Sequence, residues 1–371
     1  MLRAFFGLAT ISVLLLGCSS SSPRIAVASA PTPTPSALAP LAPSGEPVVL
    51  ATGLAAPWSI VRLGAKDSTL ISERDSGKVL ERLPSGVVRE IGTVPGVAAD
   101  GEGGLLGLAV HHRNATGPAR WLYAYFTAAN DNRIVRMPLE GSPGSYRLGA
   151  VTTILTGMAK ARNHDGGRIA FGPDAMLYAT VGDAGQPDRA QNLASLNGKI
   201  LRMTAEGAVP KDNPFPGSLV YSLGHRNPQG IAWDSAGQLW SSEFGQNTWD
   251  EFNRIVPGGN YGWPLVEGIG SKAGLIDPVY QCKTSEASPS GLAYVGGTFF
   301  LAALRGERLW SIFPSAQTRA VPFLVGRFGR LRDAVPGPEG TLWILTSNTD
   351  GYGTPGKGPD RLLEVRLASS G

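Results

Sequence analysis

One short pattern recurs along the chain and constrains its fold more than any other feature. Each copy has a turn, then Leu or Phe, an aromatic or apolar residue, and a run of small or β-branched residues. The copies are DSTLISERD, ARWLYAYFT, DAMLYATVG, GQLWSSEFG, GGTFFLAAL and EGTLWILTS, led by Leu70, Leu122, Leu177, Leu239, Phe299 and Leu342. Six leading residues separated by about 40 to 60 positions are typical of propeller blades rather than of helical solenoids.

The segments around each copy complete a blade. An apolar segment that ends in a turn precedes most copies, as in GGRIAFGPDAM, and a segment with Arg or Lys near its start follows, as in GKVLERL. Short alternating strands joined by Gly and Pro turns, without a helical period, indicate an all-β fold. We therefore predict a six-bladed β-propeller of four-stranded antiparallel blades over residues 48–368. Residues 46–51 (EPVVLA) are expected to pair with the last blade and remove its open edge.

The first residues indicate export. A basic Arg3, an apolar run over residues 4–16 and Leu-Leu-Gly-Cys at 15–18 predict a lipoprotein signal peptide over residues 1–17 and a lipid on Cys18. Residues 18–47, rich in Ser, Pro and Ala, would be a tether without a core. We expect a protein held on the outer face of a bacterial membrane, at the cell surface or in the periplasm, by this lipid alone. A cleaved and secreted protein without lipid is the alternative.

The charge distribution argues against a nucleic-acid partner, and the cysteine content argues against an intramolecular disulfide. The net charge is +4, but no stretch combines clustered Lys and Arg with aromatic residues, so we expect no nucleic-acid partner. With Cys18 lipidated, Cys282 is the only remaining thiol, and no intramolecular disulfide can form. The fold must then be held together by its core, for which about 320 residues are ample.

Unusual polar residues stand at equivalent positions, where a blade begins. His164 lies in NHDGG before the third blade, Arg226 lies in GHRNP before the fourth, and Glu102 precedes GGLLGLAV of the second. Arg330 and Arg332 lead into the sixth. Since these strands start at one channel mouth, we expect a single pocket in which facing arginines hold a polyanionic small molecule. The alternative is that the last two arginines form surface salt bridges, for example to Asp333.

A loop of the fourth blade has the chemistry of a calcium site. In SSEFGQNTWDEF, Asp250 and Glu251 offer carboxylates, while Gly245 and Gln246 offer main-chain carbonyls. Such hard oxygen ligands suit Ca²⁺, and no thiol or imidazole nearby suggests zinc. Acidic pairs alone are usually solvated, so the motif is weak by itself.

With these residues in view, the chain from about Leu54 to Leu367 resembles the soluble-type quinoprotein sugar dehydrogenases, especially their bacterial aldose dehydrogenase branch. The resemblance rests on GEGGLLGLAV, NHDGGRIAFGPD, YATVGDAG, YSLGHRNPQG, SEFGQNTWDE, GGNYGWP, ALRGERLW, GRLRD and TSNTDGYGTP. Members of this family use pyrroloquinoline quinone (PQQ) and calcium. The resemblance implies oxidation of an aldose at its anomeric carbon to the lactone, with hydride transfer to the quinone and electrons passed to an external acceptor of unknown identity.

The resemblance also implies roles for individual residues. His164 would be the general base, which suits an imidazole that titrates near neutral pH, and Asp183 would orient it. The residues implied to contact the cofactor are Glu102, Arg226, Asn227, Arg305, Arg330 and Arg332, with Arg226 also beside the reacting groups. The carbonyls of Gly245 and Gln246 would hold the calcium at the quinone, and Glu251 with the Tyr261 carbonyl would hold a second, structural calcium.

Three positions depart from the family pattern. Glu102 stands where the glucose enzymes have glutamine, which puts the sugar preference in doubt. Arg305 replaces a lysine and keeps its charge with a different geometry. Ser271 falls where those enzymes have an acidic ligand of a further calcium, so we predict no site there.

Two other functions compete with the dehydrogenase. One is a non-catalytic propeller that binds a glycan or protein ligand, which would have no need of the His164 and Asp183 pair. The other is a calcium-dependent lactonase, which would need several carboxylates in the channel where this chain has arginines. Within the dehydrogenase reading, His225 is the rival base, although we expect it to support its loop.

Overall fold

The computed structural model describes residues 1–2, 39–64, 67–112, 120–353 and 358–370. The expected signal peptide beyond residue 2, the lipidation site Cys18 and the expected tether as far as residue 38 lie outside the described residues. Within the described part, no helix has both the length and the apolar character needed to cross a membrane.

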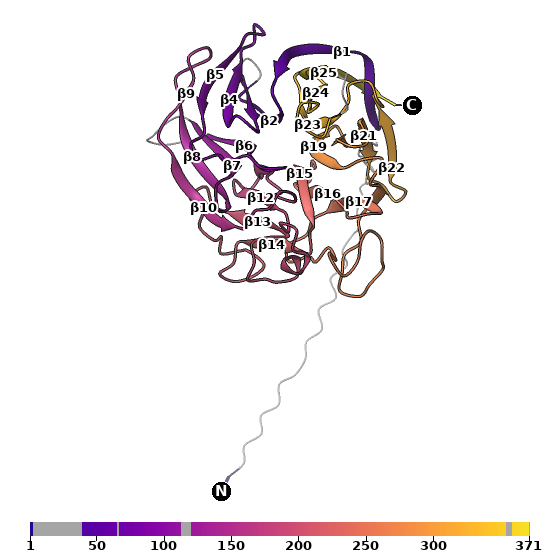
Figure 1. Cartoon of the computed structure of the whole chain (residues 1–371). Coiled ribbons are helices and arrows are strands. Elements are labelled where there is room, and N and C mark those ends of the chain that lie inside the picture. Colours follow the sequence, from indigo (N-terminus) through magenta and orange to yellow (C-terminus); the bar gives the residue numbers. More distant parts are fainter. Residues whose placement is uncertain (3–38, 65–66, 113–119, 354–357, 371) are drawn as a thin grey trace, which may run out of the picture. The chain divides into compact units, whose positions relative to one another are not determined.

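The described residues form six antiparallel sheets around one axis (Figure 1). The first contains β2 (Pro57–Arg62), β3 (Thr69–Glu73), β4 (Lys78–Arg82) and β5 (Val88–Thr93). The second contains β6 (Leu105–His112), β7 (Arg120–Thr127), β8 (Asn132–Glu140), β9 (Arg147–Leu148) and β10 (Thr152–Met158). The third contains β11 (Ile169–Phe171), β12 (Leu177–Val181), β13 (Lys199–Met203) and β14 (Val220–Leu223).

The fourth sheet contains β15 (Asn227–Trp233), β16 (Leu239–Phe244), β17 (Trp249–Arg254) and β18 (Tyr280–Lys283). The fifth contains β19 (Pro289–Val295), β20 (Thr298–Ala303), β21 (Arg308–Phe313) and β22 (Arg319–Phe323). The sixth contains β23 (Leu331–Pro336), β24 (Thr341–Thr346), β25 (Asp360–Ser369) and β1 (Leu41–Leu54). The predicted six-bladed propeller is confirmed. Two small additions are β9, a short strand paired with β8, and the 3₁₀ helix η1 (Pro187–Ala190).

The sixth sheet joins the two ends of the propeller. β1 pairs antiparallel with β25, with Val49 opposite Leu363, which confirms the expected pairing of residues 46–51. β1 begins at Leu41, so residues 41–47 of the expected tether belong to this strand. Their Pro, Ser and Gly content suggested a segment without structure, but β25 is long enough to extend the ladder to Ser369, with an irregularity between Ser44 and Val48.

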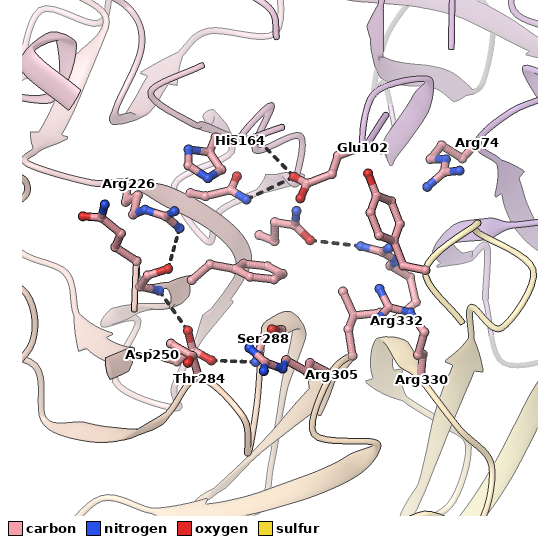
Figure 2. A pocket seen from close by; sticks show the side chains of 17 residues that line it. Arg74, Glu102, His164, Arg226, Asp250, Thr284, Ser288, Arg305, Arg330 and Arg332 are labelled. Atoms are coloured by element: carbon pink, nitrogen blue, oxygen red, sulfur yellow. Dashed lines mark hydrogen bonds between the residues drawn. The ribbon is translucent and has the colours of Figure 1, made fainter. Parts of the chain in front are cut away.

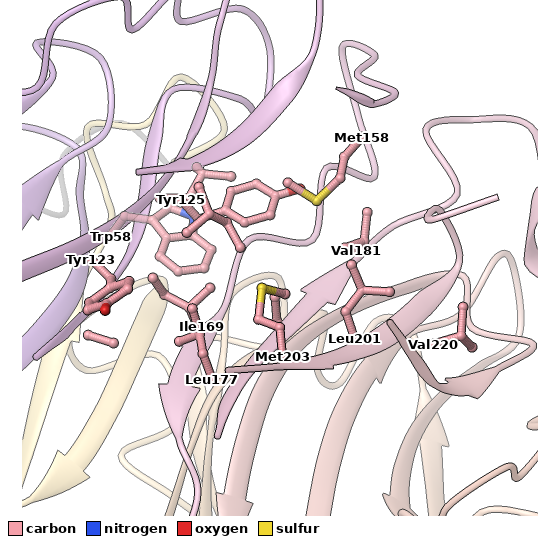
Figure 3. Packing of buried hydrophobic residues seen from close by; sticks show 14 of the residues in the cluster. Trp58, Tyr123, Tyr125, Met158, Ile169, Leu177, Val181, Leu201, Met203 and Val220 are labelled. Carbon is pink, nitrogen blue, oxygen red and sulfur yellow. The ribbon is translucent and has the colours of Figure 1, made fainter. Parts of the chain in front are cut away.

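The hydrophobic core lies between neighbouring blades. The six leading residues of the repeated pattern are all buried on the second strand of their blades. One cluster, shown in Figure 3, packs Trp58 of the first blade against Tyr125 of the second and Ile169 of the third. The hydroxyl of Tyr125 also donates a hydrogen bond of 2.8 Å to the carbonyl of Asp165, just after His164. The core is therefore tied directly to the turn that carries the candidate base.

The blades form a closed ring around the channel. β2 contacts β6, and β6 contacts β11; β12, which pairs with β11, contacts β15; β15 contacts β19, β19 contacts β23, and β23 returns to β2. The loops that lead into the innermost strands open at the same mouth of the channel. Glu102, His164, Arg226 and Arg330, which are far apart in sequence, stand in four of these loops.

Ring closure gives a first testable prediction. Leu363 of β25 is fully buried, whereas Val49, opposite it on β1, is about half exposed, at 50 %. Because Leu363→Ala leaves a cavity between strands, we expect it to lower the free energy of unfolding by about 2–5 kcal/mol. Val49→Ala is the matched control and should cost less than about 1 kcal/mol. Urea denaturation measures both, and equal losses would contradict this description of the closing blade.

Candidate active site

The channel mouth contains a cavity of about 410 Å³. Figure 2 shows Arg226 on one side of it, Arg330 and Arg332 on the other, and His164 and Glu102 between them. The lining residues predicted from the sequence are Glu102, His164, Arg226, Asn227, Gly245, Gln246, Arg305, Arg330 and Arg332. Others that line it are Arg74, Gln229, Phe244, Asp250, Thr284, Ser288, Leu304 and Tyr352. The fold thus gathers residues from all six blades in one place.

The imidazole of His164 is oriented by Asp183. Its Nδ1 lies 2.7 Å from Oδ1 of Asp183, and its side chain remains 12 % exposed. Oδ1 of Asp183 also accepts the main-chain N–H of Gly185 at 2.7 Å, and Oδ2 accepts the indole N–H of Trp263 at 2.9 Å. Since Nδ1 is engaged, Nε2 is the ring nitrogen available to the cavity.

Asp183 is ionised, as the orientation of His164 requires. Burial opposes its ionisation, but the hydrogen bonds from His164, Trp263 and Gly185 outweigh burial and hold the pKa of Asp183 below its usual range. An ionised Asp183 favours the proton on Nδ1 of His164, which leaves a lone pair on Nε2. The pair can therefore accept a proton from a molecule in the cavity.

The main chain at His164 has an uncommon conformation. Its φ is +61°, in the left-handed region that non-glycine residues seldom adopt. The N–H of His164 donates to Oε2 of Glu102 at 3.0 Å, and its carbonyl accepts the N–H of Ala184 at 3.2 Å. A Cβ on Gly182 would lie 2.0 Å from that carbonyl, so the position has no room for a side chain. Two segments, around Glu102 and over residues 182–184, thus hold the turn in place.

Glu102 and Asn227 support the same turn. The buried Asn227 accepts the N–H of Gly166 on its Oδ1 at 3.0 Å and donates from Nδ2 to Oε2 of Glu102 at 3.4 Å. Glu102 therefore accepts hydrogen bonds from both His164 and Asn227 while facing the cavity. Both interactions use an oxygen acceptor, which a glutamine at this position would also provide.

Asp350 is the centre of an arginine cluster. Its Oδ2 lies 3.1 Å from Arg330 Nη2 and 3.2 Å from Arg332 Nη2, and its carbonyl accepts a hydrogen bond from Arg74 Nη2 at 2.9 Å. Burial opposes the charge of Asp350, but Arg332 and Arg330 outweigh it and lower the pKa of the carboxyl. Asp350 thus holds two guanidinium groups with its ionised carboxylate and a third, that of Arg74, with its main-chain carbonyl.

The expected alternative, a surface salt bridge from Arg330 or Arg332 to Asp333, is wrong. Asp333 is buried and pairs with Arg168, with Oδ2 and Nη1 2.9 Å apart. Arg332 is also buried, and burial lowers its pKa to about 10. Within the described part of the chain, the Nε atoms of Arg332 and Arg226 are buried and have no hydrogen-bond partner.

The balance of charge in the cavity favours an anion. Five guanidinium groups line it against two carboxylates, those of Glu102 and Asp250, while Asp350 pairs with Arg330 and Arg332 without lining the cavity itself. Burial raises the pKa of Asp250 to about 6, so the cavity disfavours the charged form of this carboxyl. Facing guanidinium groups with excess positive charge are stabilised by a ligand carrying several carboxylates.

The predicted calcium ligands fall into two groups. Gly245 and Gln246 line the cavity, and the carbonyl of Gly245 accepts a short hydrogen bond from Arg226 Nη1. Glu251 and Tyr261 do not line it. Glu251 accepts the N–H of Gly268 at 2.8 Å, and burial together with the nearby charge of Glu243 raises its pKa to about 8.

No contact found in the described residues joins Glu251 to Tyr261, whose N–H donates to the carbonyl of Leu223. Groups of three or more His, Cys, Asp or Glu arranged around a metal position are absent from this part of the chain. Any metal in this part of the chain would therefore need oxygen ligands in addition to these side chains.

His225 does not compete with His164 as the base. It is fully buried, with Nδ1 2.8 Å from Oε2 of Glu243 and Nε2 2.8 Å from Oγ of Ser222. Its ring stacks on Tyr261 with centroids 4.8 Å apart. Both ring nitrogens are occupied, so His225 supports its loop, as expected from the sequence.

Sequence reasoning missed Arg74, Gln229, Trp263 and Asp350. Arg74 and Asp350 follow the second strands of their blades, β3 and β24, whereas the charged residues predicted from the repeat alone were those that precede first strands. Both strand ends open at the same mouth, so charged residues after second strands were a usable signal. Trp263 belongs to a long loop, and its sequence position carries no comparable signal.

A six-bladed propeller with a carboxylate-oriented imidazole beside an anion-binding cavity has the parts of an enzyme that acts on a small molecule together with a polyanionic cofactor. The family model described as Glucose / Sorbosone dehydrogenase matches residues 54–354. The chain belongs to this family, and the resemblance drawn from its motifs is confirmed.

Known relatives agree with this assignment. An aldose sugar dehydrogenase of Escherichia coli is 32 % identical over 82 % of this chain and 90 % of its own length. The quinoprotein glucose dehydrogenase B of Acinetobacter calcoaceticus is 35 % identical over 60 % of this chain, which spans about half, 53 %, of that relative. The PQQ-bound aldose sugar dehydrogenase of Streptomyces coelicolor superposes with a TM-score of 0.81 at 48 % identity, covering 88 % of this chain and 100 % of that one.

Asp165, next to His164, gives a prediction about pH. Its Oδ1 accepts hydrogen bonds from Asn132 Nδ2 at 2.8 Å and from the N–H of Ala161 at 3.3 Å, while Oδ2 is buried without a partner among the described residues. Burial raises the pKa of Asp165 to about 7. Because this exceeds the pKa of about 3.9 in the unfolded chain, its contribution to stability is complete below pH 4 and is lost as the pH rises through 7.

Asp165→Asn removes this titration and keeps an oxygen acceptor. We expect the variant to gain stability relative to the wild type as the pH rises from about 4 to 8, by on the order of 2–4 kcal/mol. Urea denaturation across this range measures the difference. Parallel pH profiles of the two proteins would show that Asp165 is not held in its neutral form.

Proposed function

We propose that the protein oxidises an aldose sugar at its anomeric carbon to the lactone, with PQQ and calcium as cofactors, and passes the electrons to an external acceptor. The observation that carries the proposal is the His164–Asp183 pair beside a cavity lined by five arginines. The PQQ-bound relative from Streptomyces coelicolor supports the choice of cofactor. Attachment outside the cell through a lipid on Cys18 is part of the same proposal, on the strength of residues 1–18.

The residues of the cavity suit a flat molecule with several carboxylates. Arg330 and Arg332 approach from one side and Arg226 from the other, while the exposed Arg305 stands at the rim. Guanidinium groups bind carboxylates through paired N–H donors. The unpartnered Nε atoms of Arg226 and Arg332 are further donors for such a ligand. When bound, PQQ supplies the quinone that accepts hydride from the anomeric carbon of the sugar.

The protein's own groups handle the proton. Nε2 of His164 accepts the proton of the anomeric hydroxyl as the C–H bond breaks, and the resulting imidazolium is stabilised by ionised Asp183 at 2.7 Å. Glu102 and Asn227 hold the main chain of this turn, so the imidazole faces the cavity before the sugar arrives. A base held in this way contributes typically about 10² to 10⁴ to the rate.

The carbonyls of Gly245 and Gln246 would hold the calcium at the quinone, where it would act as a Lewis acid. The fit is supported by Gly245, whose carbonyl already accepts a hydrogen bond from a cationic group. Glu251 and the Tyr261 carbonyl are the proposed ligands of a second calcium. A cation there would offset the cost of burying the carboxylate of Glu251.

The central experiment adds PQQ and calcium to the purified apoprotein, then glucose and a dye that accepts electrons. We expect dye reduction by the wild type and a loss of about 100-fold or more in His164→Gln, because the proton acceptor is gone. His111→Gln is the matched control, since His111 lies at the end of β6 and packs on Phe171 away from the cavity.

The same experiment separates the alternatives. Hydrolysis of gluconolactone without quinone would favour a lactonase. Binding of a glycan or protein without uptake of PQQ would favour a non-catalytic propeller. Full activity of His164→Gln would contradict the role of the imidazole while leaving the dehydrogenase itself intact.

Asp183→Asn tests the orientation of the base. The amide cannot stabilise the imidazolium, and its N–H₂ can force the other tautomer of His164. We therefore expect kcat to fall by about 10² to 10⁴ while the affinity for PQQ stays at the wild-type level. Trp263→Phe, which removes one hydrogen bond to Asp183, should cause a smaller loss. A fall in PQQ affinity with unchanged kcat would oppose this assignment.

A further inference from the structure

Glu267 makes an unusual set of hydrogen bonds behind the candidate calcium loop. A single oxygen, Oε1, accepts four consecutive main-chain N–H groups, those of Gln246, Asn247, Thr248 and Trp249. The donor–acceptor distances are 2.7, 2.8, 2.9 and 3.2 Å in that order. The carboxylate thus gathers the amides of the whole loop on one side.

The geometry of the peptide bond then determines where the carbonyls point. The N–H of Gln246 shares its peptide plane with the carbonyl of Gly245, and the N–H of Asn247 shares its plane with the carbonyl of Gln246. In a trans peptide, N–H and C=O point in opposite directions. Because both N–H groups point at Glu267, both carbonyls point away from it.

The cavity lies on the side to which these carbonyls point. Gly245 and Gln246 line it, and the carbonyl of Gly245 accepts the guanidinium N–H of Arg226 there. Glu267 does not line the cavity. The loop therefore has a carboxylate on one side, and on the other side the carbonyls of Gly245 and Gln246, of which that of Gly245 contacts the guanidinium group of Arg226.

The Gly245 end of the loop is held by Asp250, independently of Glu267. Asp250 accepts the N–H of Gly245 on Oδ1 at 2.9 Å and the N–H of Ser288 on Oδ2 at 2.6 Å. A Cβ on Gly245 would lie 1.6 Å from the carbonyl oxygen of Trp249, so the loop is too tight for a side chain at this position. With this end held by Asp250, the direction of the next two peptide planes is set by Glu267.

Charge acts in the same direction as geometry. The amide ends of the loop dipoles point to a carboxylate, which polarises the peptide units and makes their carbonyl oxygens more negative. Such oxygens are better ligands for a hard cation. Among the described residues, no Lys or Arg forms a salt bridge with Glu267. The groups that stabilise its negative charge are therefore the loop amides.

We propose that Glu267 is a positioning residue, which turns the carbonyls of Gly245 and Gln246 into the cavity so that they bind a divalent cation. The inference rests on the calcium site of the proposed function and identifies the residue that would build it. A partner that orients metal ligands from outside typically accounts for about 10- to 100-fold in metal affinity.

The test measures Ca²⁺ affinity rather than enzymatic activity. Full-length protein treated with a chelator is titrated with Ca²⁺ by calorimetry, without quinone or sugar. Glu267→Gln keeps the size of the side chain but removes its charge, and we expect its Ca²⁺ affinity at this loop to fall by about tenfold or more.

Asp277→Asn is the matched control. Asp277 belongs to the same long loop and also accepts main-chain N–H groups, from Gly270 at 3.0 Å and Ser271 at 3.1 Å, but it does not line the cavity. The Ca²⁺ affinity of the Asp277→Asn variant should equal that of the wild type. Glu267→Asp is a second variant, since its shorter carboxylate keeps the charge but cannot reach all four amides, and we expect weakened binding here too.

Each outcome decides the inference. Wild-type affinity in both Glu267 variants would overturn it, and if dye reduction still required Ca²⁺, the proposed function would stand without it. Absence of Ca²⁺ binding by the wild type would overturn both the inference and the calcium part of the proposed function. Urea denaturation in chelator separates unfolding from weakened binding, and the inference is overturned if affinity falls only in proportion to the unfolded fraction.

Discussion

The pairing of β1 with β25 is the constraint on which the rest of the structure depends. It closes six sheets into a ring, so that the first and last blades contact each other through β2 and β23. A closed ring leaves no blade without a neighbour on either side, and its innermost strands start at a common mouth. Residues as distant in sequence as Arg74 and Asp350 meet there, with the Arg74 guanidinium bonded to the carbonyl of Asp350. An open arc of the same blades would leave these groups apart.

This ring concentrates charge that would be unstable without compensation. Asp350 neutralises part of the arginine cluster, and Asp183, held ionised by three donors, sets the tautomer of His164. The remaining positive charge is what an anionic cofactor would meet. Asp333 pairs with Arg168 deeper in the channel and is fully committed there. Asp350 and Asp183 thus serve the cavity, whereas Asp333 stabilises the fold through Arg168.

Much of the fold could be predicted because it depends on local pattern. The six leading apolar residues recur with the spacing of blades, and each is buried where the pattern required. The positions of His164, Arg226 and Arg332 also followed from the repeat, since equivalent positions in equivalent blades face the same mouth. The family motifs added the pairing with Asp183. The start of β1 was not predicted, because strand pairing with β25, and not the composition of residues 41–47, decides it.

The amino-acid sequence by itself determined the number of blades, the closure of the ring and the mouth at which the chemistry gathers, because all three follow from periodic burial and turn residues. Only the tertiary structure decided which charges pair. Asp350, not Asp333, holds Arg330 and Arg332, and Glu267 gathers the amides of the candidate calcium loop from a segment about twenty positions away. Electrostatic pairing depends on distances between atoms after folding, and those distances are not encoded in the spacing of residues along the chain.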